Sequence, residues 1–192
     1  MRVITGSAKG RKLASVPGDS TRPITDRVKE ALFNILAGEV EDAVVLDLFA
    51  GTGGVGIEAL SRGAREVWFV DREWKAVQTV KANLQTTGFL GQAKVIRQDA
   101  FKALHQMSGK AAFDIVYVAP PQYQGLWADA LAQIDVLDVL APDGLVIAQI
   151  HPKEYHDLPL KRLRLVDKRK YGSTILCFYS AGESAAPEGD AS

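Results

Sequence analysis

The sequence contains one cysteine, Cys177, so no disulfide bond can form within the chain. Cys177 lies in the apolar run Thr174 to Tyr179, and free cysteines in such runs are typically buried. We therefore expect a core thiol rather than a catalytic one. No apolar run approaches the roughly 20 residues of a membrane-spanning helix, and the N-terminus lacks the apolar core of a signal peptide. These absences predict a cytoplasmic protein without a membrane span.

The chain also lacks net charge, with 23 basic and 23 acidic side chains. The distribution is uneven, because residues 1–30 and 153–170 each carry seven Lys or Arg against three Asp or Glu. Two basic zones on a neutral protein indicate a binding surface for a polyanion. They are explained equally well as ordinary solvent-exposed surface. No cluster of His, Cys, Asp and Glu has metal-ligand spacing, so we predict no metal.

One stretch, Val44 to Gly56, combines an apolar run, a glycine-rich loop and the start of a helical pattern. The apolar run predicts a buried strand that ends near Asp47. Glycine lets the backbone approach a ligand closely, and a helix start offers free N–H groups. The stretch therefore predicts a site for a nucleotide-type cofactor.

Short apolar strands alternate with helices along most of the chain. Strands are predicted at residues 43–48, 66–70, 93–97, 113–118 and 144–150, and helices at 54–62, 73–87, 100–107 and 125–139. This alternation is typical of an α/β fold with a parallel sheet covered on both faces. Residues 160–166 and 174–180 leave no room for a helix between them. They predict an antiparallel hairpin at one sheet edge, with Lys168, Arg169 and Lys170 in its turn.

The N-terminal region is expected to form a small extension. Residues 2–5 and 11–16 predict a β-hairpin with a basic tip. Thr25 is a suitable N-cap for a helix that runs to about Ala37 and ends at Gly38. The expected organisation is a hairpin extension in residues 1–20, the main domain in 21–180 and a disordered acidic tail in 181–192.

The glycines alone do not identify the cofactor. They match G-x-G-x-x-G, which with an acid twenty residues on is also the dinucleotide fingerprint; the residues are Gly51, Gly53, Gly56 and Asp71. Asp47 favours S-adenosylmethionine over NAD, because a carboxylate repels a diphosphate and attracts an ammonium and a sulfonium. Asp71 can accept hydrogen bonds from a ribose diol, and Asp99 can accept one from an adenine amino group. Each acid taken singly is equally well explained as a helix N-cap.

The loop after the fourth predicted strand, Ala119 to Gln124, borders the same pocket by strand order. Two prolines fix its shape and leave carbonyl groups without local N–H partners. Considered alone, the loop could also be a stiff connector before a helix. His151, which follows the fifth predicted strand, is expected near the mouth of the pocket.

Five segments resemble the RsmD-type 16S rRNA (guanine-N2)-methyltransferases of bacteria. They are the N-terminal Gly6 to Leu13 and Thr21 to Asn34 blocks, the glycine loop from Leu46 to Gly53, Glu58 to Ala64, and Lys170 to Thr174. The resemblance spans residues 1–180. It implies a Rossmann-like class I methyltransferase with a mostly parallel seven-stranded sheet, S-adenosylmethionine as cofactor, and a guanine amine of small-subunit rRNA as methyl acceptor.

The resemblance also implies which residues meet the cofactor and the RNA. The cofactor set is Asp47, Phe49, Gly51, Thr52, Gly53, Asp71, Arg72, Asp99 and Ala100, with Arg27 and Asn34 from the first helix. The RNA set is Arg2, Lys9, Arg11, Lys12, Arg22, Lys168, Arg169 and Lys170. The implied partner is 16S rRNA or a small-subunit assembly particle. A monomer is the default expectation for the chain.

The chain departs from this family in its catalytic loop, which normally reads Asp-Pro-Pro-Tyr. Here the loop reads Ala119, Pro120, Pro121, Gln122 and then Tyr123. In the usual loop the carboxylate and a carbonyl orient the amine while the ring stacks on the flipped base. The carbonyls remain here, Gln122 offers an amide acceptor and Tyr123 a ring, so we expect a working but rewired site. The alternatives are an RNA-binding protein that has lost catalysis and, less favoured, an NAD-dependent dehydrogenase.

Overall fold

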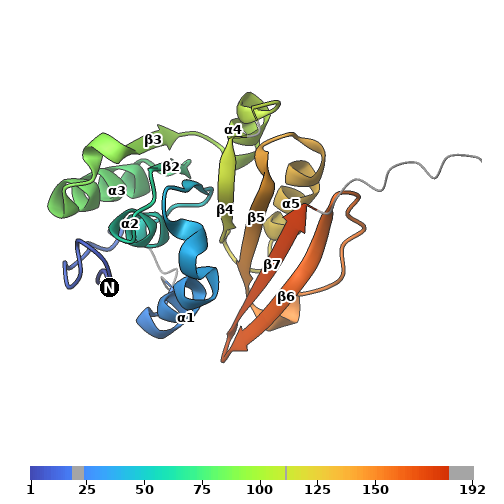
Figure 1. Ribbon diagram of the computed structural model, residues 1–192, viewed down its shortest axis with the longest axis horizontal. Helices are drawn as coiled ribbons and strands as arrows, with labels where there is room; N and C mark the ends of the chain where they lie inside the picture. Colours follow the sequence, from blue (N-terminus) through green and yellow to red (C-terminus); the bar gives the residue numbers. More distant parts are fainter. Residues whose placement is uncertain (19–23, 111, 182–192) are drawn as a thin grey trace, which may run out of the picture.

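The structure is a computed structural model that describes residues 1–18, 24–110 and 112–181 (Figure 1). Its centre is a seven-stranded sheet with the order β3-β2-β1-β4-β5-β7-β6. The strands are β1 (Val44–Asp47), β2 (Glu66–Asp71), β3 (Ala93–Arg97), β4 (Phe113–Val118), β5 (Leu140–Ile150), β6 (Leu163–Tyr171) and β7 (Thr174–Ala181). Strands β1 to β5 are parallel, whereas β7 runs antiparallel to both β5 and β6. The predicted parallel sheet with an antiparallel edge hairpin is confirmed.

Helices cover both faces of the sheet. One apolar cluster lies beneath α1 (Asp26–Leu36), α2 (Gly54–Ser61) and α3 (Trp74–Thr87), and the other lies beneath α4 (Ala100–Met107) and α5 (Leu126–Val136). Neighbouring strand residues divide between the clusters, as Val45 and Leu46 do, which explains why β1 is apolar without alternation. Three short 3-10 helices complete the fold: η1 (Ala37–Val40), η2 (Leu90–Gln92) and η3 (Pro152–Glu154).

Two further features bear on the sequence predictions. Cys177 is buried, and burial raises the pKa of its thiol to about 11, which confirms a core thiol. No helix in the described ranges is long and apolar enough to cross a membrane.

Several element boundaries differ from the prediction. Helix α1 ends at Leu36, and Ala37 with φ of 39°, not Gly38, is where the backbone leaves the helix. Helix α5 ends at Val136 because Leu137 is already extended. Strand β5 begins four residues earlier than predicted, since Leu140 pairs with Phe113 ahead of an irregularity in the ladder.

The predicted position of the C-terminal basic residues is wrong. Lys168, Arg169 and Lys170 lie on strand β6, which continues to Tyr171 opposite Thr174. The turn is formed by the next two residues alone, and Gly172 supplies the positive φ, 60°, that a two-residue hairpin turn requires. Charged side chains are common on an edge strand, so this basic run did not have to interrupt β6.

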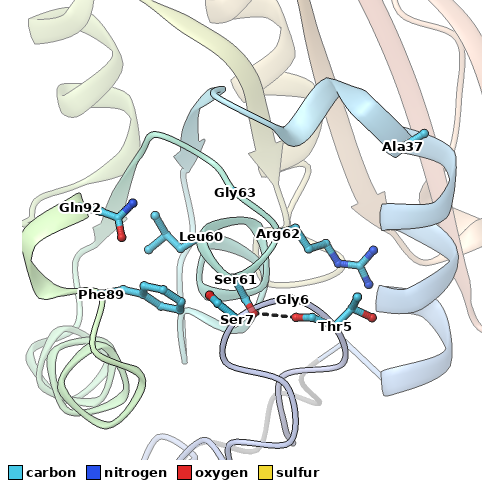
Figure 2. A pocket seen from close by; sticks show the side chains of 10 residues that line it. All are labelled: Thr5, Gly6, Ser7, Ala37, Leu60, Ser61, Arg62, Gly63, Phe89 and Gln92. Atoms are coloured by element: carbon cyan, nitrogen blue, oxygen red, sulfur yellow. Dashed lines mark hydrogen bonds between the residues drawn. The ribbon is translucent and has the colours of Figure 1, made fainter.

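The N-terminal segment, residues 1–14, is docked on the main domain and is not a regular hairpin. Its two arms share one isolated antiparallel bridge, between Arg2 and Lys12, in place of the predicted strands. Val3 and Leu13 are buried in the cluster under α2 and α3. Figure 2 shows Gly6 beside the end of α2, where the Ser61 hydroxyl donates to the Thr5 carbonyl at 2.6 Å. Arg22 and residues 182–192 of the predicted tail lie outside the described residues.

A buried ion pair joins the N-terminal segment to α1 and α2. The carboxylate of Glu58 lies 3.3 Å from the ammonium of Lys29, and both side chains are fully buried. The same carboxylate accepts from the backbone N–H groups of Ile4 at 2.8 Å and Thr5 at 3.0 Å. Lys29 donates to the carbonyl of Arg2 at 2.6 Å. Glu58 thus fixes where the N-terminal segment lies.

Candidate active site

The site is set by the point at which the strand order reverses. From β1 the chain moves outward to β2 and β3, and then crosses to β4 on the other side of β1. Open α/β sheets bind ligands outside the carboxyl ends of the strands at such a point. Asp47, at the end of β1, is paired with Tyr117 of β4, and the N–H of Leu48 donates to the Tyr117 carbonyl at 3.0 Å. The glycine loop and the loop after β4 therefore begin side by side.

The glycine loop uses its glycines in two ways. Gly51 and Gly53 have φ of 54° and 75°, a region that residues with a Cβ rarely adopt. Gly56 lies inside α2 and is needed for space, because a Cβ there would be 2.3 Å from the ring of Phe69. The loop is therefore tightly turned and its helix is packed directly on β2.

Acids at the ends of β1 and β2 hold this loop. The buried carboxylate of Asp47 accepts from the N–H of Gly56 at 3.2 Å. Asp71 accepts from the N–H of Gly51 through one oxygen and from that of Glu73 through the other, both at 2.9 Å. Burial raises the pKa of Asp47 to about 7, and the neighbouring Asp71 adds to the rise while the Gly56 N–H opposes it. Two carboxylates thus lie beside the glycine loop.

Asp99 adopts the N-cap role that the sequence left open. Its Oδ1 accepts from the N–H groups of Phe101 and Lys102, each at 3.1 Å, at the start of α4. Ala100 is the first residue of that helix, and Phe49 of the glycine loop meets Phe101 edge to face at 6.5 Å. The end of β3 is thereby linked to the glycine loop through an aromatic pair.

Asn83 is a positioning residue that sequence reasoning missed. It is buried on α3, and its amide donates to the Thr52 carbonyl at 2.9 Å and to the Ala14 carbonyl at 3.1 Å. Its oxygen accepts from the N–H of Ala14 at 2.7 Å. The sulfur of Met1 also lies 3.9 Å from the hydroxyl of Thr52. The N-terminal segment thus braces the glycine loop, and nothing in the local pattern of α3 distinguished Asn83.

In the loop after β4, most of the predicted site residues are exposed to solvent. Pro120 is buried and Ala119 is half-buried, whereas Pro121, Gln122 and Tyr123 are exposed. The Tyr123 ring lies 5.4 Å from the ring of His151, so His151 lies beside this loop.

The remaining predicted residues lie on three surfaces. Arg27 and Asn34 are exposed on α1, and Arg72 is exposed beyond the end of β2, where it pairs with Glu73. The N-terminal cations are exposed on the docked segment, and the other basic group lines the edge strand β6. Figure 1 shows these two basic zones at well-separated parts of the molecule. Their RNA-contacting role stays a prediction.

A broad cavity of about 580 Å³ lies elsewhere (Figure 2). Its walls come from the N-terminal segment, the end of α2 with the residues after it, the start of η1, and the two ends of the η2 region: Thr5, Gly6, Ser7, Ala37, Leu60, Ser61, Arg62, Gly63, Phe89 and Gln92. Because the glycine loop precedes α2, this cavity is at the opposite end of that helix. It contains none of the predicted cofactor or loop residues. No group of three or more potential metal ligands converges within the described ranges.

Replacing Gly56 with alanine is expected to destabilise the fold by about 1–3 kcal/mol, the usual cost of overpacking a core. The added Cβ would lie 2.3 Å from Phe69 and 2.8 Å from Val67, and both neighbours are buried. Urea unfolding measures the change. Gly91→Ala is the matched control, because its Cβ would meet nothing within 4 Å. Equal stability of the two variants would contradict the close packing of α2 on β2.

Comparison with known proteins identifies relatives along almost the whole chain. The family model described as Conserved hypothetical protein 95 matches residues 1–180. The YlbH protein of Bacillus subtilis is 44% identical over 182 residues, which cover 93% of this chain and 98% of that protein. The Ribosomal RNA small subunit methyltransferase D of Haemophilus influenzae is 35% identical, with 89% of this chain and 93% of that protein covered.

Solved structures agree with this result. The structure of Escherichia coli yhhF has a TM-score of 0.82 and 34% identity, and the match covers 94% of this chain and 97% of that one. An RNA methyltransferase from Salinibacter ruber, solved with S-adenosyl-L-homocysteine, has a TM-score of 0.66 over 88% of this chain and all of its own, and at 13% identity it shows the fold alone. The present chain belongs to the Conserved hypothetical protein 95 family, the RsmD-type methyltransferases.

Proposed function

We propose that the chain transfers a methyl group from S-adenosylmethionine to the exocyclic N2 of a guanine in 16S rRNA. The observation that carries this proposal is the pair of carboxylates, Asp47 and Asp71, bound to a glycine loop at the strand switch point. It is supported by family membership and by the name of the Haemophilus relative, a small-subunit rRNA methyltransferase. The N2 position and the 16S substrate come from the resemblance described above.

The residues present fit a cationic cofactor. Asp47 is a buried carboxylate whose charged neighbour in this site, Asp71, is also an acid. A diphosphate would add negative charge to the same space, whereas an ammonium or a sulfonium would be attracted to it. When bound, S-adenosylmethionine supplies an electrophilic methyl group. In this proposal, Asp47 and the loop residues Gly51 to Gly53 face its amino-acid part. Asp71 and Arg72 face its ribose, and Asp99 and Ala100 its adenine. Arg27 and Asn34 of α1 cover the site.

The loop after β4 would receive the guanine. The carbonyls of Ala119 and Pro120 and the amide of Gln122 accept hydrogen bonds from the amine and orient its lone pair. Tyr123 stacks on the base, as aromatic rings do on flipped nucleotides. Little base strength is required, because the amine becomes strongly acidic once it is methylated. The rate therefore depends on positioning in the pocket, which alone can supply several kcal/mol.

The two basic zones would hold the rRNA backbone. Exposed Lys and Arg on the N-terminal segment and on β6 contact phosphates, which gives affinity without choice of sequence. In this proposal the enzyme acts as a monomer in the cytoplasm.

Two measurements on the unmodified protein test the proposal. Calorimetry is expected to show tighter binding of S-adenosylmethionine than of NAD, and tighter NAD binding would refute the cofactor assignment. Tritium transfer from labelled S-adenosylmethionine to 16S rRNA or small-subunit particles should yield N2-methylguanine on nucleoside analysis. Label in another nucleoside or position would refute the N2 assignment. A protein that binds both cofactor and RNA without transfer is the second candidate function, which the loss of the loop carboxylate and tyrosine favours.

The rewired loop is tested separately by the double variant Gln122→Ala/Tyr123→Ala. We expect the rate of methyl transfer to fall by about 10²-fold, which is the rate loss that a misplaced reacting group causes. Single-turnover kinetics with 16S rRNA measures the change. The control is Gln124→Ala, because this exposed residue of the same loop has no assigned role. An unchanged rate in the double variant would disprove this account of the loop.

A further inference from the structure

A carboxylate from another segment controls the shape of the loop after β4. Glu154 lies in η3, beyond the end of β5. Its Oε1 accepts from the backbone N–H of Tyr123 at 2.5 Å, and its Oε2 accepts from the backbone N–H of His151 at 3.3 Å. One side chain therefore joins the loop after β4 to the segment after β5.

Tyr123 needs such support because its backbone is strained. Its φ of 61° lies in the left-handed region, where a side chain with a Cβ is disfavoured. Strained residues persist when the surrounding structure fixes them, and they cluster at functional sites. The backbone N–H of Tyr123 donates to Glu154, so this hydrogen bond supports the strained backbone.

The result is a pair of neighbouring rings at the surface. The ring centroids of Tyr123 and His151 are 5.4 Å apart, with the planes inclined by 41°. Tyr123 is 64% exposed, so its ring is available to a ligand. His151 is itself held in place by two hydrogen bonds. Its ring Nδ1 accepts from the backbone N–H of Lys153 at 3.1 Å, and its backbone N–H donates to Glu154.

We propose that Glu154 is a positioning residue that holds Tyr123 against His151, so that the two rings form a stacking ledge for an unpaired base of the substrate RNA. This inference rests on the proposed function, because the base belongs to the RNA to be methylated. Unpaired RNA bases stack on aromatic side chains, which is how proteins recognise single strands. One cation of β6 lies near η3, because the ammonium of Lys168 is 3.8 Å from the ring centre of Tyr155, the residue after Glu154.

The ledge is tested with a short single-stranded RNA that contains 2-aminopurine, whose fluorescence falls when the base stacks. The unmodified protein and Tyr123→Phe are expected to quench the probe, whereas Tyr123→Gly is not. In methylation kinetics, Tyr123→Gly should raise the KM for 16S rRNA about tenfold, the loss of one base–aromatic stack. The Kd for S-adenosylmethionine should remain within about twofold, since the ring acts on RNA.

Glu154 is tested through Tyr123 by a double-mutant cycle. Glu154→Ala should weaken quenching and raise the KM in the unmodified background, and should add no further loss to Tyr123→Gly. Glu154→Gln retains an oxygen acceptor and is expected to restore most of the quenching. Glu39→Ala, an exposed acid in η1, is the matched control.

Each outcome bears on one proposal alone. Normal quenching and a normal KM for Glu154→Ala would overturn the ledge, and so would an equal loss in both backgrounds, which marks a purely structural role. A protein that quenches the probe but transfers no methyl group would refute the proposed function and leave the ledge intact. Melting temperatures of all variants separate loss of fold from loss of the ledge.

Discussion

Glu58→Ala is expected to lower the free energy of unfolding by about 3–5 kcal/mol, the usual result of breaking a buried ion pair. The change leaves the ammonium of Lys29 fully buried without its carboxylate, which lies 3.3 Å away in the intact protein. It also removes the acceptor of two backbone N–H groups in the N-terminal segment. Burial lowers the pKa of Lys29 and Glu58 opposes this, so the pKa should fall further in the variant.

The pH dependence gives this prediction a second signature. In the variant, the pKa of folded Lys29 should lie further below the ordinary value of 10.5 that applies to the unfolded chain. Stability therefore rises with pH between the two pKa values, since the unfolded state binds more protons there. The loss caused by Glu58→Ala should be largest near neutral pH and should shrink towards pH 10. Lys29→Met in the same chain should recover part of the loss, because it removes the unpaired charge.

Urea unfolding at pH 7 and at pH 9.5 measures both effects. Asp138→Ala is the matched control, because Asp138 pairs with Arg162 at 3.4 Å with both side chains about half exposed. Such surface pairs contribute up to about 1 kcal/mol. If Glu58→Ala proved no more destabilising than the control at pH 7, the buried pair would not anchor the N-terminal segment.

Local patterns predicted the fold well where one face or both faces of an element are buried. Buried strands such as β1 and β4 are mostly apolar, so they were placed to within a residue. The edge strand β6 was misplaced because Lys168, Arg169 and Lys170 are exposed on both of its faces, so the local sequence resembles a loop. Pairing with β7, not composition, decides that these residues are extended.

The site was predictable where its residues follow strand ends in order. The positions of Asp47 and Asp71 beside the glycine loop were predictable because each closes a strand that precedes a glycine or a helix, and their contact with the cofactor stays a prediction. Glu58, Asn83 and Glu154 were missed because their partners are distant in sequence: 54 residues for Glu58 and Ile4, 69 for Asn83 and Ala14, and 31 for Glu154 and Tyr123. Each is a polar residue on an ordinary helical stretch, and only the folded chain shows that it holds a loop in place.

Asp47→Asn is expected to have opposite effects on stability and on cofactor binding. The pKa of Asp47 is raised to about 7 in the folded protein from 3.8. Between these values the folded state keeps a proton that the unfolded state has released, so the contribution of Asp47 to stability falls as pH rises. The fall is on the order of 2–4 kcal/mol by pH 7.5, at about 1.4 kcal/mol per unit of pKa shift.

Asparagine has a similar shape and keeps an oxygen for the N–H of Gly56, but it does not titrate. The variant should therefore gain stability relative to the unmodified protein as pH rises from 5 to 7.5. Urea unfolding at pH 5 and at pH 7.5 measures the difference in stability between the two proteins. The contributions of other titrating groups cancel in this difference. A difference that is independent of pH would show that Asp47 has an ordinary pKa.

Binding should change in the other direction, because the carboxylate that destabilises the empty protein is the one that attracts a cation. At pH 7.5 we expect Asp47→Asn to raise the Kd for S-adenosylmethionine about 10–100-fold, because one charge interaction of a buried carboxylate is lost. In the unmodified protein, affinity should increase from pH 6 to 7.5, since binding favours the ionised form of Asp47. Calorimetry in buffers of different ionisation enthalpy should detect a proton released on binding at pH 6, and the variant should release none. Equal affinity of the two proteins at pH 7.5 would show that Asp47 does not bind the cofactor. Asp47 would then give no reason for the site to favour a cation over a diphosphate.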